Sequence, residues 1–274
     1  MKLHRPQIRT KNHTAAPLRG NLGEYAMRCI IRLGSRISTE AAFPRMPQGR
    51  PVIEINTPYA CHNSGDKILM KQKFDEVEVK TADWEVLSNI SDIDGRDWDI
   101  FPAIIKHRNS CKGEGIYFVE SAEDLAIKMT ELRPNSSYII ERYMGFQKEY
   151  RLHVTKDGCF YTCRKMLKAD AEERWHRHDT NSVWIMEENP LFEKPKNWDA
   201  VIAECVKALN AVGLTIGACD VKIQSEKGRG ADFTPDFIVL EINSAASLGM
   251  VTLEKYLQKL PEIIKDKITN YGRA

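Results

Sequence analysis

Two apolar runs near the end of the chain carry polar side chains at the spacing of β-strands. Residues 218–224 read ACDVKIQ, with Asp220 inside the run, and residues 237–243 read FIVLEIN, ending in Glu241 and Asn243. Residues two apart on a strand point to the same face, so Glu241 and Asn243 share one side of a sheet. If the two strands pair, Asp220 reaches that side, and such oxygen groups are ligands that Mg²⁺ prefers. An edge strand with solvent-facing polar groups explains the same pattern.

Periodic patterns predict further elements along the rest of the chain. Apolar runs at 25–33 and 51–56 predict strands that end in polar turns, which suits an open α/β sheet whose ligands bind beyond the strand ends. Further strands are predicted at 103–106, 116–119, 138–144, 148–154 and 160–167. Capping residues or helical spacing of apolar positions predict helices that begin near Ser64, Ser121 and Asp199.

A basic loop that contains glycine connects two of these strands. The strand 103–106 ends in Lys106, and Gly113 and Gly115 lie in the loop before the strand 116–119. Such a flap can fold its backbone amides over phosphates while the lysine at its root reaches them. There is no G-x-x-x-x-G-K-[ST] motif, and an ordinary β-hairpin with a glycine turn explains the pattern equally well.

Composition and charge narrow the function classes. With 274 residues, 42% of them hydrophobic, the chain can form two lobes that share a cleft, and its net charge of +2 gives no general reason to expect nucleic acid or a membrane surface as a partner. The seven cysteines are scattered and lack a C-x-x-C pair, which argues against a disulfide framework or a zinc module. No apolar run approaches the roughly 20 residues of a membrane span. We therefore expect a soluble cytoplasmic protein.

Taken in order, these features resemble the ATP-grasp superfamily of carboxylate–amine ligases, over roughly Asn56 to Leu248. The ordered set is a lysine at a helix start, a strand lysine before a glycine flap, a hinge strand E-R-Y-M, a basic strand, and D-(insert)-E-x-N. The resemblance implies ATP and Mg²⁺ as cofactors and an α+β fold in which two α+β lobes clamp ATP behind a short α/β segment. The implied parts are the N-terminal segment 1–66, the flap lobe 67–140 and the C-terminal lobe 141–274.

The resemblance also implies roles for individual residues. Of the residues that would bind ATP, Lys67, Lys106, Gly113 and Gly115 would contact the phosphates, the hinge residues Glu141 and Tyr143 the adenine, and Glu149 the ribose hydroxyls. The metal ligands would be Asp220, Glu241 and Asn243. The catalytic groups beside the triphosphate would be Asn181 and either Arg164 or Lys165. Arg151 is a further catalytic candidate, taken from the arginines near the expected cleft and not from the resemblance. The chain departs from the family at EINSAASLG, where the usual E-[IV]-N-x-x-P-G has a proline.

The implied activity is amide formation from a carboxylate and an amine through an acylphosphate, with release of ADP and phosphate. The C-terminal half looks most like ligases that add amino acids to protein or peptide ends, and the R-L-G-S turn resembles small bacteriophage ligases. We expect a small-molecule or peptide carboxylate and an amine as substrates, with the carboxylate held by Arg32 and Arg151 because arginine forks match carboxylates. Arg28, Arg36 and Arg164 are further arginines near the expected cleft. A phosphotransferase and a non-catalytic nucleotide-binding module are the alternatives.

Overall fold

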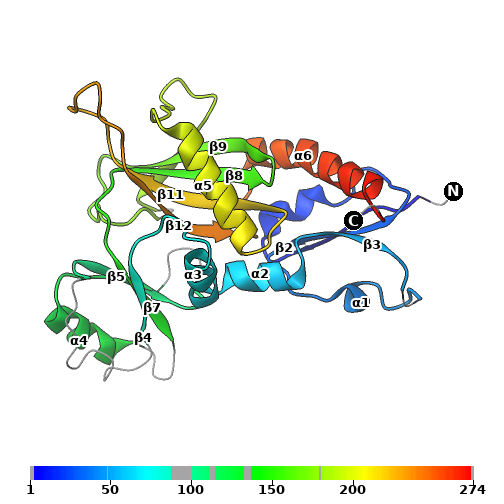
Figure 1. Ribbon diagram of the computed structural model, residues 1–274, viewed down its shortest axis with the longest axis horizontal. Helices are drawn as coiled ribbons and strands as arrows, with labels where there is room; N and C mark the ends of the chain where they lie inside the picture. Colours follow the sequence, from blue (N-terminus) through cyan, green and yellow to red (C-terminus); the bar gives the residue numbers. More distant parts are fainter. Residues whose placement is uncertain are drawn as a thin grey trace.

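Three sheets form the framework of the protein. The computed structural model describes residues 3–47, 49–87, 100–110, 115–132, 137–178 and 180–272. Within these residues the strands form sheets of three, four and five strands. Figure 1 shows the three-stranded sheet at the right, together with both chain ends, the four-stranded sheet at the lower left, and the five-stranded sheet between and above them.

The N-terminal sheet is parallel, in the order β1-β2-β3. Its strands are β1 (Gln7–Thr10), β2 (Arg28–Leu33) and β3 (Val52–Ile55), with the short helices η1 (His13–Leu18) and α1 (Thr39–Ala42) in the connections. The helices α2 (Pro58–Gly65) and α3 (Lys67–Asp75) follow β3. Asp66 caps α3 by accepting from two backbone N–H groups. The two predicted strands and the predicted helix are confirmed, although β2 and α3 begin later than predicted.

The flap sheet is antiparallel, in the order β4-β7-β5-β6. Its strands are β4 (Trp84–Leu87), β5 (Ala103–His107), β6 (Ile116–Val119) and β7 (Tyr138–Arg142), and α4 (Ala122–Glu131) packs beside them. Leu125 of α4 is buried against Ile105 and Ile140, which gives this lobe its own small core. Ser121 caps α4 as the sequence predicts.

The five-stranded sheet is antiparallel, in the order β10-β9-β8-β11-β12. Its strands are β8 (Lys148–Thr155), β9 (Gly158–Leu167), β10 (Ser182–Met186), β11 (Ile216–Ile223) and β12 (Phe237–Asn243). Asp220 lies directly opposite Glu241, so the predicted pairing of the two apolar runs is confirmed. A bulge between Asp220 and Val221 shifts the register just beyond this pair.

Helices cover the two faces of the five-stranded sheet differently. The helix α5 (Trp198–Ala211) lies across β8 and β11 in Figure 1 and packs on one face, where Leu152 and Val221 are fully buried. Complete burial of side chains of this size stabilises the fold by about 1.5–3 kcal/mol each. On the other face, α6 (Met250–Thr269) joins the N-terminal sheet in a second core. The remaining part of that face is polar.

The division at residue 67 stays a prediction, and α3 shows why it is hard to place. Met70 and Phe74 of α3 pack in the core beneath the five-stranded sheet, not in the core of the flap lobe.

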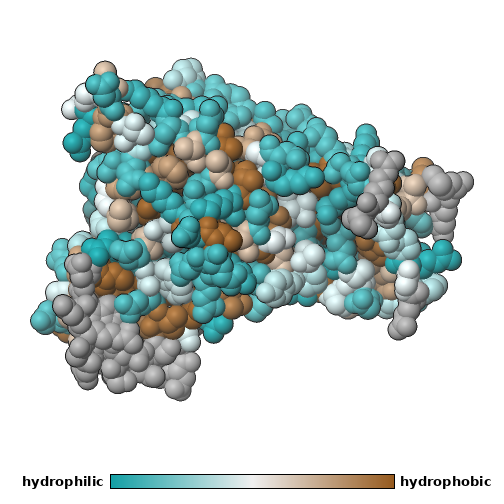
Figure 2. Space-filling model, viewed as in Figure 1, coloured by the Kyte–Doolittle hydropathy of each residue, from teal (hydrophilic) through white to brown (hydrophobic). Residues whose placement is uncertain are grey.

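The space-filling view in Figure 2 shows hydrophilic residues spread over the viewed face, with hydrophobic residues in small groups between them. None of the helices in the described residues is long and apolar enough to cross a membrane.

Candidate functional site

Glu141 lies between two lysines at the end of β7. Its Oε1 is 3.0 Å from Lys71 Nζ and its Oε2 is 2.6 Å from Lys106 Nζ. Burial by itself raises the pKa of Glu141, but the charges of Lys106 and Lys71 bring the pKa down to about 2. The carboxylate therefore stays ionised and fixes both ammonium groups. Lys106, predicted to contact phosphate, is held at the root of the flap by this pairing.

Lys67 lies between the flap and the carboxylate of Glu241 on β12. It is the first residue of α3, and its Nζ donates to the carbonyl oxygen of Ser110 at 2.5 Å. Its charge also lowers the pKa of Glu241, which places Lys67 near that carboxylate as well. In the flap, Gly115 has a φ of 64°, which favours glycine, and Gly113 lies outside the described residues.

Asp220, Glu241 and Asn243 come together on β11 and β12. Asn243 Nδ2 donates to Glu241 Oε1 at 2.8 Å and lies 3.4 Å from Asp220 Oδ2, so one amide spans both carboxylates. Burial raises the pKa of Asp220, and Arg151 opposes this rise. Burial also acts to raise the pKa of Glu241, but Lys67 and the Asn243 hydrogen bond lower it overall.

This trio fits a divalent cation. Two carboxylates that face each other repel when both are ionised unless positive charge lies between them, and the Asn243 side chain can turn its oxygen towards the same point. Hard oxygen donors of this kind suit Mg²⁺. In the described residues, no three His, Cys, Asp or Glu side chains lie together in a way that could hold a metal. In the trio, the amide oxygen of Asn243 would be the third ligand.

Arg151 lies directly beside the trio on β8. Its Nε and Nη2 donate to the two oxygens of Asp220, at 2.7 Å and 2.8 Å. The guanidinium also lies over the ring of Trp184, 4.9 Å from the ring centre. Because this bidentate pair holds Asp220 in one orientation, Arg151 both orders a predicted metal ligand and supplies positive charge next to it.

Glu149 and Lys222 face each other across β8 and β11, close to the hinge. Glu149 lies 3.4 Å from Arg177 Nη1, measured to its Oε2. Burial raises the pKa of Glu149, and Arg177 and Lys222 oppose this rise. Burial lowers the pKa of Lys222 to about 8, although Glu149 opposes the change. The position predicted to take ribose hydroxyls is thus lined by one carboxylate and two cations.

Aromatic side chains join the two lobes beside this carboxylate. Lys222 Nζ is 4.9 Å from the ring centre of Tyr143, and the Tyr143 ring meets Phe118 edge-to-face at 5.1 Å. Phe118 also stacks on Trp175 at 5.6 Å. The backbone N–H of Tyr143, a predicted adenine contact, already donates to the carbonyl oxygen of Pro102. Its ring is therefore the group left to face the cleft. Trp175 comes from the loop between β9 and β10, which therefore reaches across to the flap sheet.

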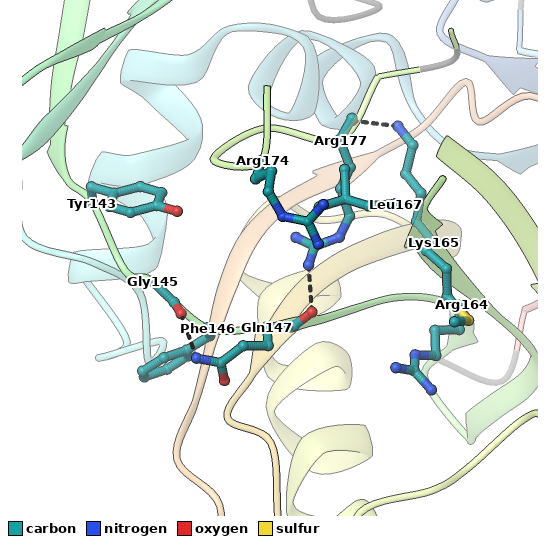
Figure 3. A pocket seen from close by; sticks show the side chains of 10 residues that line it. Tyr143, Gly145, Phe146, Gln147, Arg164, Lys165, Leu167, Arg174 and Arg177 are labelled. Atoms are coloured by element: carbon teal, nitrogen blue, oxygen red, sulfur yellow. Dashed lines mark hydrogen bonds between the residues drawn. The ribbon is translucent and has the colours of Figure 1, made fainter. Parts of the chain in front are cut away.

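A pocket of about 250 Å³ opens between the hinge, β9 and this loop. Figure 3 shows Arg174 and Arg177 next to each other above Gln147, with Lys165 reaching the carbonyl oxygen of Arg177. That hydrogen bond is 2.7 Å long. Among the residues that the structure describes, none of those that line the pocket is acidic: Tyr143, Gly145, Phe146, Gln147, Arg164, Lys165, Met166, Leu167, Arg174 and Arg177. The pocket therefore suits an anionic or hydroxyl-rich part of a ligand.

Two predicted catalytic residues do not reach the trio. The Arg164 guanidinium lies over the Tyr150 ring at 5.8 Å, and its Nη1 is 3.7 Å from Glu193, on the face that α5 covers. Lys165, the alternative for the same role, pairs with Glu149 on β8. It therefore lies on the face of the sheet that carries Asp220 and Glu241, which we call the site face. Asn181 uses its side chain inside the loop, since it donates to two loop carbonyls and accepts from a loop N–H. Asn181 therefore shapes the loop that carries Arg177.

The prediction that Arg32 holds a substrate carboxylate is wrong. The side chain has no exposed surface, and its donors serve Ile37, Thr39 and Glu54 within the N-terminal part, at 2.7–2.8 Å. An arginine within a strand is predicted to have an exposed side chain. The sequence does not indicate that other groups of the N-terminal part surround Arg32. Arg28 lies over the Phe43 ring at 5.9 Å.

Three charged residues of the site were missed by the sequence reasoning. Lys71 lies one helical turn after Lys67, and Lys222 lies two residues after Asp220 on the same strand, so helix and strand periods would have found both. Arg177 belongs to a highly charged loop, where no periodic signal distinguishes it from its neighbours.

A search of protein-family models and one of curated proteins found no match to this chain. Solved structures do match its fold. D-alanine–D-alanine ligase from Bacillus anthracis aligns over 87% of this chain and 81% of its own, with a TM-score of 0.60 and 15% identity. The same enzyme complexed with ATP gives a TM-score of 0.60 at 14% identity, over 87% and 80% of the two chains. D-alanyl-alanine synthetase A from Vibrio cholerae gives 0.59 at 16% identity, over 90% and 78%.

These similarities cover 87–90% of this chain. Identities of 14–16% carry the fold and not the substrate. The predicted α+β arrangement of two lobes behind a short α/β segment is confirmed at this level. The protein has the ATP-grasp fold seen in these D-alanine–D-alanine ligases.

Proposed function

We propose that the protein is an ATP-dependent ligase that joins a carboxylate to an amine. The observation that carries this proposal is the presence of two charged clusters. One cluster, on the flap side, contains Lys71, Glu141 and Lys106, and the other, on β11 and β12, contains Asp220 and Glu241. One cluster suits phosphate oxygens and the other suits the cations that accompany them. The similarity to D-alanine–D-alanine ligases, one of them complexed with ATP, supports the same conclusion.

Each cluster would bind one part of Mg²⁺-ATP. Lys67 and Lys106 would donate to the phosphates, while the Tyr143 ring and Glu149 would take the base and the ribose. Asp220, Glu241 and Asn243 would hold Mg²⁺, which supplies charge neutralisation at the phosphates when bound. The metal would then share the oxygens of Asp220 that Arg151 holds.

The residues of this chain would support two successive displacements. A carboxylate oxygen attacks the γ-phosphorus, the bond from that phosphorus to the bridging oxygen of ADP breaks, and an acylphosphate forms. The amine nitrogen then attacks the acyl carbon, phosphate leaves, and the amine gives up a proton. Arg151 and Lys165 would offset negative charge on the site face during both steps. The flap root at Lys106 would keep water away from the acylphosphate.

The substrates proposed are a small-molecule or peptide carboxylate and an amine, in the cytoplasm. The proposed reaction needs ATP, which the cytoplasm contains. The cysteines among the described residues are free thiols, as is usual for proteins of a reducing compartment. The substrate class is inferred from the positive charge that Arg151 and Lys67 supply beside the trio.

An ADP-release screen of carboxylates crossed with amines tests the proposal, with the products identified by mass. A ligase releases ADP and phosphate and forms a product with the mass of both substrates less one water. A phosphotransferase makes ADP without free phosphate and leaves a phosphate on its product. ADP formation stimulated by a hydroxyl compound and by no carboxylate would overturn the ligase assignment, and Glu241→Gln serves as the inactive control.

A further inference from the structure

Charge is distributed unevenly along the chain. Residues 1–66 contain ten Lys and Arg against four Asp and Glu, a net charge of +6, whereas the whole chain has +2. The remaining residues therefore carry a net charge of −4. Three of the four acidic residues in the basic part already pair with arginines, namely Glu24, Glu54 and Asp66. The N-terminal part consequently keeps most of its positive charge uncompensated.

Five exposed cations carry this excess. Arg32 is buried in its pair with Glu54, and Arg5 pairs with Glu24 at the surface. In the described part of the chain, five further exposed side chains have no hydrogen-bond or ion-pair partner: Lys11, Arg19, Arg36, Arg45 and Arg50. An unpartnered arginine or lysine is common at a surface, so position decides which of the five matter.

Lys11 and Arg36 lie at the carboxyl edge of the parallel sheet. Lys11 directly follows β1, and its backbone N–H donates to Leu33 at 3.0 Å, which places it beside the end of β2. Arg36 follows β2, and one terminal nitrogen of its guanidinium would lie 3.2 Å from a Cβ atom added to Gly65. The two cations thus flank Gly34. Ligands of parallel sheets bind beyond this edge.

The same edge touches the loop that follows the metal-side trio. A Cβ atom at Gly34 would lie 2.6 Å from the Cβ of Ala245, too close for any side chain at position 34 unless Ala245 moved, so Gly34 and Ala245 are in close contact. Ser64 and Ser244 share a hydrogen bond of 2.9 Å, and Ser244 is the residue after Asn243. Lys11 and Arg36 are therefore next to the loop that begins at the trio, and Gly65 lies two residues before Lys67.

We infer that the carboxylate substrate carries a second anionic group, which Arg36 and Lys11 bind. This inference rests on the proposed function. One carboxylate would face the γ-phosphate near Lys67, and the second would meet Arg36, whose planar fork binds a carboxylate with two hydrogen bonds. A substrate with one negative charge would leave these cations uncompensated. The class that fits is an acidic amino acid, either free or at the end of a peptide.

Matched substrates separate charge from size. L-glutamate and L-glutamine have nearly the same shape and differ by one charge, and each can be supplied free and as the C-terminal residue of a dipeptide. We expect kcat/KM for ADP release to be at least about tenfold higher for the acid than for its amide, because the site's cations would be left unpaired by the amide. The free and peptide arms tell the two sources apart.

Matched variants place the effect at the sheet edge. Arg36→Gln and Lys11→Gln should remove most of the preference for glutamate, while Arg45→Gln and Arg19→Gln, which change two of the other exposed arginines without a partner among the described residues, should keep it. All four positions are exposed, and thermal unfolding checks that each variant is folded. Equal kcat/KM for acid and amide in the wild type, or a preference that survives Arg36→Gln, would overturn the inference.

A binding measurement distinguishes this inference from the ligase assignment. Calorimetric titration with glutarate and with butyrate, a diacid and a monoacid, needs no turnover. Tighter binding of glutarate that is lost in Arg36→Gln supports the anion site even if no carboxylate releases ADP, in which case only the ligase assignment fails. If glutarate binds no better than butyrate and glutamate gives no more ADP than glutamine, the inference is overturned while the ligase assignment stands on the other carboxylates.

Discussion

The two faces of the five-stranded sheet are built from alternate residues of the same strands, yet they have opposite character. On the face covered by α5, Leu152, Val221 and Val239 are completely buried. On the other face, their neighbours Arg151 and Asp220 form a bidentate ion pair. The strand period of two therefore separates stability from chemistry by a single residue step.

This comparison teaches where each kind of substitution should act. A change on the covered face removes apolar contacts and should lower the free energy of unfolding with little specific effect on ATP. A change on the site face should lower activity and leave the fold intact. The four predictions below test this separation, beginning with the largest expected effect.

Glu241→Gln should reduce ADP formation by at least about a thousandfold, roughly 4 kcal/mol of activation barrier, because a metal-side carboxylate is lost at the centre of charge. The free energy of unfolding, measured in urea, should stay within about 1 kcal/mol of the wild type. Glu254→Gln, at an exposed position of α6, is the matched control and should leave both quantities unchanged. Unchanged ATP turnover in Glu241→Gln would contradict the metal assignment.

Lys106→Met tests the other side of the cleft. Methionine keeps the side-chain length and removes the charge, so Lys71 alone would hold Glu141. We expect the concentration of Mg-ATP needed for half-maximal rate to rise and phosphoryl transfer to slow by about 3 kcal/mol, the scale for losing one preorganised charge. Steady-state kinetics over a range of Mg-ATP concentrations measures both. Identical kinetics in the two proteins would remove Lys106 from the phosphate site.

Leu152→Ala tests the covered face. Leu152 has no exposed surface and packs in the core beneath α5, so the cavity and the lost apolar contacts should lower the free energy of unfolding by about 3 kcal/mol. Urea unfolding measures this loss. Under conditions where the variant is folded, its half-saturating Mg-ATP concentration should match that of the wild type. A large change in that concentration without loss of stability would show that the two faces are not separate.

His153→Gln tests a buried residue on the site face, where the expected effect is a change in how stability depends on pH and is small near pH 7. Burial, with a smaller contribution from Arg151, lowers the pKa of His153 to about 3, whereas an unfolded histidine titrates near 6.5. Between these values the unfolded chain binds a proton that the folded protein does not, so the histidine's part of the stability falls as pH drops below 6.5. The slope from this one group is at most about 1.4 kcal/mol per pH unit.

Urea unfolding at a series of pH values between 4 and 7 should therefore show a shallower pH dependence for His153→Gln than for the wild type. Glutamine at the exposed position His13 is the control for the substitution itself. Parallel curves for His153→Gln and the wild type would show that His153 takes up its proton without unfolding.

The parts of this site that follow from local periodicity could be predicted from the sequence. Asp220, Glu241 and Asn243 were placed together because two strands with a short insert pair as neighbours. The choice between Arg164 and Lys165 could not be made, since adjacent residues face opposite ways and only the register of β9 against β8 decides between them. In the same way, the strand pattern around Arg32 contains nothing about the Glu54 and Thr39 groups that enclose it.

Contacts between distant segments could not be predicted from the sequence either, because they depend on how separate elements pack together. The approach of Arg177 to Glu149 and of Lys71 to Glu141 joins elements that are far apart in the chain. The helix α6 is not among the elements that the sequence predicts, yet it buries Tyr256 and Leu260 against the N-terminal sheet. Each of these arrangements depends on how whole elements pack, which the period of a single element does not encode.

The stacking of Trp175 on Phe118 gives the molecule a built-in optical signal. Trp175 comes from the loop of one lobe and Phe118 from a strand of the other, so the environment of one indole depends on how far the lobes are apart. Tryptophan emission shifts to longer wavelength when the ring gains contact with water. Any relative motion of the lobes therefore changes the protein's own fluorescence, and comparison with a Trp175→Phe variant would isolate that change without an attached dye.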